Sequence, residues 1–153
     1  MLSGFLWRIP RLFLLRKQYD SALGCCIQAL ITKPGYQEAL SLKGEIYLQV
    51  KDYQNALAAY DELLQLNPTS CEAWIFKGHI YSEMKEFSQA KNSFQKAFEI
   101  KPDTDFLLGT IIQNDLQICD WGSLDLEMRQ LTDGIKDGKR VAIPYNLISL
   151  IES

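Results

Sequence analysis

Two adjacent stretches of equal length decide the fold: Gln37–Ser70 (QEALSLKGEIYLQVKDYQNALAAYDELLQLNPTS) and Cys71–Thr104 (CEAWIFKGHIYSEMKEFSQAKNSFQKAFEIKPDT). Aligned at an offset of 34 residues, they pair Gly44 with Gly78, Tyr47 with Tyr81, Ala56 with Ala90, Tyr60 with Phe94 and Pro68 with Pro102. The same offset pairs Ala22 with Ala56 and Pro34 with Pro68, which indicates a more degenerate copy upstream. A repeat of this length predicts stacked copies of one small structural unit.

Within each copy the residue types indicate two antiparallel helices. Trp74, Ile75, Gly78 and Tyr81 recur at helical spacing and predict the first helix. Gly78 and Ala90 are small where the two helices must approach closely, and a proline closes each second helix. The pattern resembles the tetratricopeptide repeat. This resemblance implies an all-α fold, a solenoid of helix-turn-helix units whose first helices line a concave side.

We therefore expect an array over residues 1–104, made of a degenerate unit (3–36) and two regular units (37–70 and 71–104). In the first unit Pro10 stands at the small glycine position, so its first helix is expected to begin near Pro10. Residues 105–153 form a predicted helical connector. It contains a helix over 106–116 and a second over 124–135, with Ser123 as its N-cap and Gly138 beyond its end. Residues 141–153 are expected to form a strand or an extended segment.

Composition and charge exclude several classes of function. The 153 residues have a net charge of −3 and 47% hydrophobic residues, which disfavours disorder and nucleic-acid binding. The four cysteines contain no C-x-x-C pair and His79 is the single histidine, so no metal site, cofactor or catalytic group is predicted. This cysteine usage favours a reducing cytoplasm. The apolar, basic N-terminus is broken by Arg8, Pro10 and Arg11, which disfavours a targeting peptide or a membrane anchor.

A binding surface for a protein or peptide is what remains. Positions 2, 5, 9 and 12 of the two regular units should face inward: Glu38, Ser41, Glu45 and Leu48, then Glu72, Ile75, His79 and Ser82. Two alternatives stay open, since these residues could be solvated surface or a seat for the C-terminal helices. Tetratricopeptide domains that grip chaperone carboxylates have Lys and Asn at inward positions 5 and 9. Here those positions hold Ser41, Glu45, Ile75 and His79, which disfavours such a partner.

A second resemblance lies after the repeats. Asp105-Phe106-Leu107-Leu108-Gly109, Cys119-Asp120-Trp121 and Pro144-Tyr145 look like the connector of SPINDLY-type O-linked N-acetylglucosamine transferases. In that family such a connector leads from tetratricopeptide repeats into a two-lobed domain that uses a UDP-sugar. Inward position 6, an asparagine in the long superhelices of that family, is Leu42 and Phe76 here. Those lobes need about 300 residues, which do not follow in this sequence.

Two functions are therefore expected. One is the repeat and connector region of an O-GlcNAc-transferase-like protein, a fragment or truncated product that binds a partner or acceptor protein without transferring sugar. The alternative is a free-standing tetratricopeptide adaptor. An exposed apolar connector could also hold two copies together as a homodimer.

Overall fold

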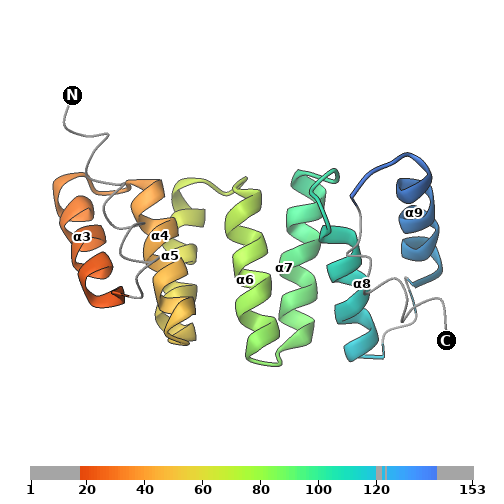
Figure 1. The fold of residues 1–153 in the computed structure, drawn as a ribbon, viewed down its shortest axis with the longest axis horizontal. Helices are drawn as coiled ribbons and strands as arrows, with labels where there is room; N and C mark the ends of the chain where they lie inside the picture. The colour runs from red at the N-terminus through yellow and green to blue at the C-terminus, as the bar shows by residue number, and fades with distance from the viewer. Residues whose placement is uncertain (1–17, 120–121, 123, 141–153) are drawn as a thin grey trace. The chain divides into compact units, whose positions relative to one another are not determined.

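The computed structural model describes residues 18–119, 122 and 124–140 (Figure 1). These residues form seven helices and no strand, which confirms the all-α class. The helices are α3 (Tyr19–Thr32), α4 (Gln37–Gln49), α5 (Tyr53–Leu66), α6 (Cys71–Glu83), α7 (Phe87–Ile100), α8 (Leu107–Gln117) and α9 (Leu124–Lys136). The chain divides into two compact units between Thr69 and Ser70. The helix expected near Pro10, the N-cap at Ser123 and the extended segment 141–153 lie outside the described residues.

The three repeated prolines stop the second helices where the sequence predicts. Helices α3, α5 and α7 end at Thr32, Leu66 and Ile100, each two residues before its proline. Proline cannot donate the next helical hydrogen bond, and it restrains the residue before it to extended backbone. The caps Lys33, Asn67 and Lys101 share that backbone, with ψ of 90°, 85° and 88°.

The turns between paired helices contain a residue in the left-handed conformation that could not be predicted from the sequence, because it is a lysine and not a glycine. Lys51 and Lys85, at the same repeat position, have φ of 61° and 60°. At Lys85 the amide donates to the Ser82 carbonyl at 3.0 Å, and the next amide, of Glu86, donates to the Tyr81 carbonyl at 2.8 Å. These two bonds are those of a Schellman motif, which normally places glycine at the left-handed position.

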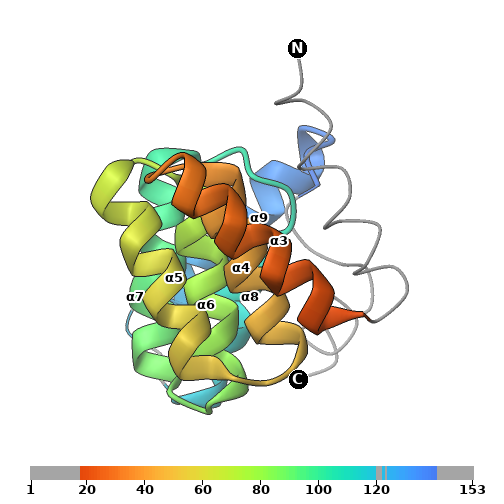
Figure 2. The same ribbon diagram turned by 90° about the vertical axis from the view of Figure 1, so that its left-hand side faces the viewer.

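A glycine against an aromatic ring closes each regular hairpin. A Cβ placed on Gly44 would lie 2.6 Å from Cε2 of Tyr60, and one on Gly78 would lie 2.5 Å from Cε1 of Phe94. Both rings are fully buried, because the missing side chains leave them the space between the helices. In the first compact unit, α3 lies beside the α4–α5 hairpin (Figure 2). Ala22 and Cys26 of α3 pack against Ile46 of α4.

Helix α8 continues the repeat geometry although the sequence signature has stopped. Its residues Leu107, Ile111, Ile112 and Asn114 are buried, at the same offset of 34 from the buried Ala73, Lys77, Gly78 and Ile80 of α6. After α8 comes Cys119, with φ of 53°, at the offset expected from Lys51 and Lys85. The described structure therefore contains one more first helix with the turn that ends it.

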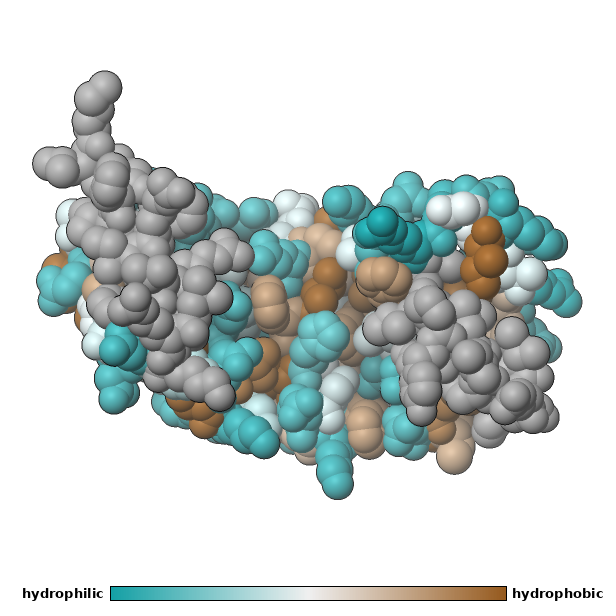
Figure 3. All heavy atoms as spheres, viewed as in Figure 1, coloured by the Kyte–Doolittle hydropathy of each residue, from teal (hydrophilic) through white to brown (hydrophobic). Residues whose placement is uncertain are grey.

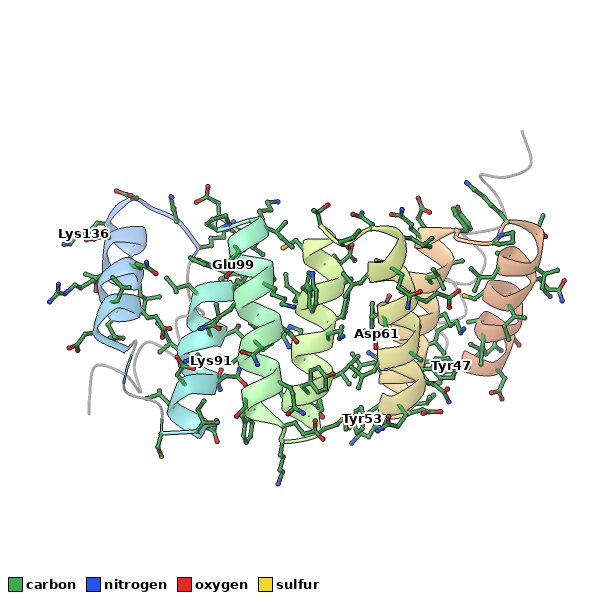
Figure 4. The ribbon with its side chains drawn as sticks, turned by 180° about the vertical axis from the view of Figure 1, so that it is seen from behind. Tyr47, Tyr53, Asp61, Lys91, Glu99 and Lys136 are labelled. Carbon is green, nitrogen blue, oxygen red and sulfur yellow. The ribbon has the colours of Figure 1, made fainter. Side chains whose placement is uncertain are left out.

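Two sets of contacts hold α8 and α9 in the second unit. Lys91 extends from α7 toward α8, and its Nζ lies 2.9 Å from Oδ1 of the fully buried Asp115 (Figure 4). Helix α9 packs through Leu131 against Leu108 and Ile112. At the end of α9, Gly138 has φ of 73°, which confirms the predicted stop.

Candidate functional site

Helix geometry places the eight predicted inward residues on one face of α4 and one face of α6. Spacings of three, four and three residues put all four positions of a helix on the same side. We call the set on α4 (Glu38, Ser41, Glu45, Leu48) and the set on α6 (Glu72, Ile75, His79, Ser82) the A-faces. The two sets belong to different units, so each is considered by itself.

None of the four A-face residues of α4 is among the fully buried residues of this helix. The buried residues of α4 are Ala39, Leu40, Gly44 and Ile46, none of which belongs to the A-face. Glu38 is exposed, while Ser41, Glu45 and Leu48 are half-buried. The Tyr60 hydroxyl of α5 donates to the Ser41 carbonyl at 3.4 Å.

The A-face of α6 is partly occupied by the helix that follows. The Ser82 hydroxyl donates to Oδ1 of Asn114 on α8 at 3.1 Å. Ile75 packs against the apolar cluster that contains Leu107 and Ile111 of α8. For these two residues the structure favours the alternative of a seat for the C-terminal helices, whereas Glu72 and His79 remain exposed.

His79 stands at the edge of the core rather than in a reactive arrangement. Its ring meets that of Phe94 edge-on, with centroids 5.2 Å apart. Although part of the His79 side chain is exposed, the neighbours that its ring packs against remove some of its hydration, and this desolvation lowers the pKa of His79 below its usual 6.5. The nearby Glu83 opposes the shift. Among the described residues, no group of three or more His, Cys, Asp or Glu side chains could hold a metal ion.

Sequence reasoning did not extend the A-face to α8. The repeat offset places Gln113 and Leu116 of α8 at the positions of His79 and Ser82, and Gln113 is exposed beside the Ser82–Asn114 contact. The offset of 34 residues could have predicted this extension. It was not recognised because Ile112 stands where the two regular repeats have a glycine. The face seen in Figure 3 mixes hydrophilic and hydrophobic side chains among the described residues.

No described helix is both long enough and apolar enough to cross a membrane. The described helices are short and amphipathic, each burying one side against its neighbours.

Comparison with known proteins agrees with the repeat assignment. Residues 47–108 match the tetratricopeptide repeat family. No curated protein sequence matches the chain.

Solved structures show the same fold at low sequence identity. MamA from Desulfovibrio magneticus RS-1, residues 41 to the end, is 17% identical with a TM-score of 0.75, over 86% of this chain and 75% of that one. The first tetratricopeptide repeat domain of Spaghetti (RPAP3), bound to the HSP90 peptide SRMEEVD, is 15% identical with a TM-score of 0.70, over 75% of this chain and 91% of that one. Residues 47–108 therefore match tetratricopeptide repeats, and the all-α, tetratricopeptide-like fold class predicted from the sequence is confirmed.

Proposed function

We propose that this chain is a protein-interaction module that holds a peptide segment of a partner on its A-faces and does not itself transfer sugar. The observation that carries this proposal is the A-face of α4. Its four side chains share one side of the helix, and the residues that anchor α4 to its neighbours all lie elsewhere. A regular helix that leaves polar and apolar groups together on an open face offers both orientation and contact area to a ligand.

The structural neighbours support a peptide as the ligand. The first repeat domain of RPAP3, of the same fold, was solved with the HSP90 peptide SRMEEVD. At 15% identity this likeness concerns the fold, so the identity of the partner is not carried over. Recognition of a segment of extended or helical chain by a helical face is a common mode among repeat proteins.

The link to an O-GlcNAc-transferase-like parent rests on the sequence resemblance alone. Of the motif Cys119-Asp120-Trp121, the structure describes Cys119, which serves as the left-handed residue after α8. A repeat turn explains Cys119 without any transferase. If the parent is nevertheless of that family, the purified chain incubated with UDP-GlcNAc and an acceptor protein should transfer nothing, and measurable turnover would contradict the proposal.

Site-specific photo-crosslinking tests the interaction module directly. A photoreactive phenylalanine analogue at Leu48 should capture a defined partner segment, identified by mass spectrometry, and Glu45→Lys should abolish this capture. The same analogue at the exposed Gln65 of α5 is the matched control. Equal capture of the same segment from both positions would show that the A-face has no role.

Self-association through the connector is a separate proposal. Leu126 and Ile135 of α9 are 62% and 44% exposed, which leaves apolar surface on the last described helix. Sedimentation velocity over a range of concentrations should show a dimer that Leu126→Glu weakens. A monomer at all concentrations would remove the dimer and leave the interaction module intact.

A further inference from the structure

Acidic and basic side chains lie on different sides of α4 and α6, the first helices of the two regular repeats. In α4 and α6 the lysines occupy the same repeat position, Lys43 and Lys77. Lys77 is 9% exposed, and its Nζ lies 5.3 Å from the Trp74 ring centroid and 5.9 Å from that of Tyr81. The positive charge of α6 is therefore held over aromatic rings rather than offered on the A-face.

The lysine of α4 is also turned away from the A-face. Lys43 is half-buried and lies near Cys26 of α3. Burial raises the pKa of the Cys26 thiol to about 11, and the charge of Lys43 acts against this rise. Helix α3 packs on the side of α4 that carries Ile46, which is not the A-face. Since Lys43 lies near Cys26 of α3, its charge is directed away from the glutamates of the A-face.

The A-faces themselves carry carboxylates. Glu38 and Glu45 lie on α4, and Glu72 lies on α6. None of the three forms an ion pair with another residue in the described part of the chain. Glu83, one turn beyond His79, adds a further exposed carboxylate on the same side of α6. Within the described part of the chain, each A-face thus presents carboxylates without an ion-pair partner, and on α4 they stand on the same face as the apolar Leu48.

We infer that each A-face binds a basic peptide segment, in which lysine or arginine side chains meet the glutamates. On α4 an apolar side chain of the peptide also meets Leu48. This inference rests on the proposed function, since it names the chemistry of the ligand for the same faces. Complementary charge governs the rate and specificity of such binding, and like charges across an interface disfavour the wrong partner. A peptide ending in acidic residues would meet carboxylates on either face, Glu38 and Glu45 on α4 or Glu72 on α6.

The test uses the full chain and a positional-scanning library of capped, fluorescent peptides of about twelve residues, long enough to span a helical face. Each pool fixes one position as Lys, Arg, Asp, Glu, Leu or Phe, and binding is followed by anisotropy. Pools fixed as Lys or Arg should bind at least about 5-fold more tightly than pools fixed as Asp or Glu. Raising the salt from about 50 mM to about 500 mM should remove most of this preference.

Charge reversal on the A-faces is compared with the same reversal elsewhere. Glu45→Lys and Glu72→Lys should each weaken binding of the Lys and Arg pools by about 3- to 10-fold. The controls Glu62→Lys on α5 and Glu99→Lys on α7 change the net charge equally from exposed positions on the second helices. Figure 4 labels Glu99. These controls should leave binding within about 1.5-fold of the unmodified chain. Circular dichroism confirms that all four variants are folded.

Each remaining outcome overturns a different statement. Equal losses in the A-face variants and the controls would mean that overall charge, not the A-faces, attracts the peptide. Preference for Leu, Phe, Asp or Glu pools with losses confined to the A-face variants would overturn the basic ligand and retain the interaction module. Absence of binding by every pool would overturn both.

Discussion

The two helical hairpins of the second unit, α6–α7 and α8–α9, fill the space between their helices with different side chains. In α6–α7 the pair is Gly78 and Phe94, with the ring filling the space above the glycine. At the same offset in α8–α9 stand Ile112 and Met128, so the bulk has moved from the second helix to the first. Ile112 is fully buried, and Met128 packs against the cluster of Leu108, Ile112 and Leu131.

This comparison teaches that the repeat conserves a filled interface rather than particular residues. A core responds to total volume and shape, and one large and one small partner are exchangeable when they change together. The left-handed turn after α8 and the buried positions along it persist after the residues usually used to recognise the repeat have gone.

The largest expected effect on stability comes from enlarging Gly78 while Phe94 is left unchanged. Gly78→Ile should lower the free energy of unfolding by about 3 kcal/mol, since its Cβ would lie 2.5–2.7 Å from ring atoms of Phe94. Gly78→Ile with Phe94→Met places the residue pair of α8–α9, Ile112 and Met128, in α6–α7 and should recover more than half of that loss. Urea denaturation gives all three values. A double variant no more stable than Gly78→Ile would contradict the exchange.

A glycine without this constraint provides the control for the same substitution. A Cβ on Gly24 of α3 meets nothing within 4 Å. Gly24→Ala should therefore raise stability by about 0.5–1 kcal/mol through helix propensity, whereas Gly78→Ala should lower it.

The next effect concerns the ion pair between Lys91 of α7 and Asp115 of α8, which joins the two hairpins of the second unit. Lys91→Met removes the ammonium beside Asp115, whose side chain is 0% exposed, and should cost about 2–3 kcal/mol. Lys91→Met with Asp115→Leu replaces both charges by apolar groups and should lie within about 1 kcal/mol of the unmodified chain. Hydrogen exchange of the α8 amides reports where the loss occurs. If the single and double variants are equally unstable, the ion pair does not hold α8 in place.

A smaller effect of opposite sign is expected at the left-handed turns. Lys85→Gly and Cys119→Gly should each raise stability by about 0.5–1 kcal/mol, because glycine adopts positive φ without strain. Gly138→Ala, at φ of 73°, should lower stability by a similar amount. Thermal denaturation measures these shifts. If Cys119→Gly stabilises and Lys85→Gly does not, the two turns are not equivalent.

The smallest effect is the pH dependence contributed by His79. Burial lowers its pKa in the folded chain, so the unfolded chain binds a proton more readily. The stabilising contribution is complete above the unfolded pKa of about 6.5 and is lost as the pH falls through the lower folded pKa. Urea midpoints at about pH 7.5 and 5.5 should therefore differ less in His79→Gln than in the unmodified chain. An unchanged difference would assign the effect to other groups.

The helical hairpins could be predicted because their signals are local. Pro34, Pro68 and Pro102 remove backbone donors, and Gly44 and Gly78 remove side chains, so each constrains the chain whatever surrounds it. The candidate site was predicted only as a set of positions on a helix. Which of those positions stay open depends on the neighbouring helix, as Ser82 and Ile75 show by their contacts with α8.

The helical periodicity and the repeated glycines and prolines were thus sufficient to predict the class of fold and the ends of the second helices. They also predicted the sides of α4 and α6 that carry carboxylates. Tertiary structure alone decided that Cys119 forms a repeat turn, that Ile112 is buried where α6 has a glycine, and that Lys77 is buried. The physical reason is that backbone constraints act within a few residues, whereas volume and charge are balanced between side chains far apart in the chain.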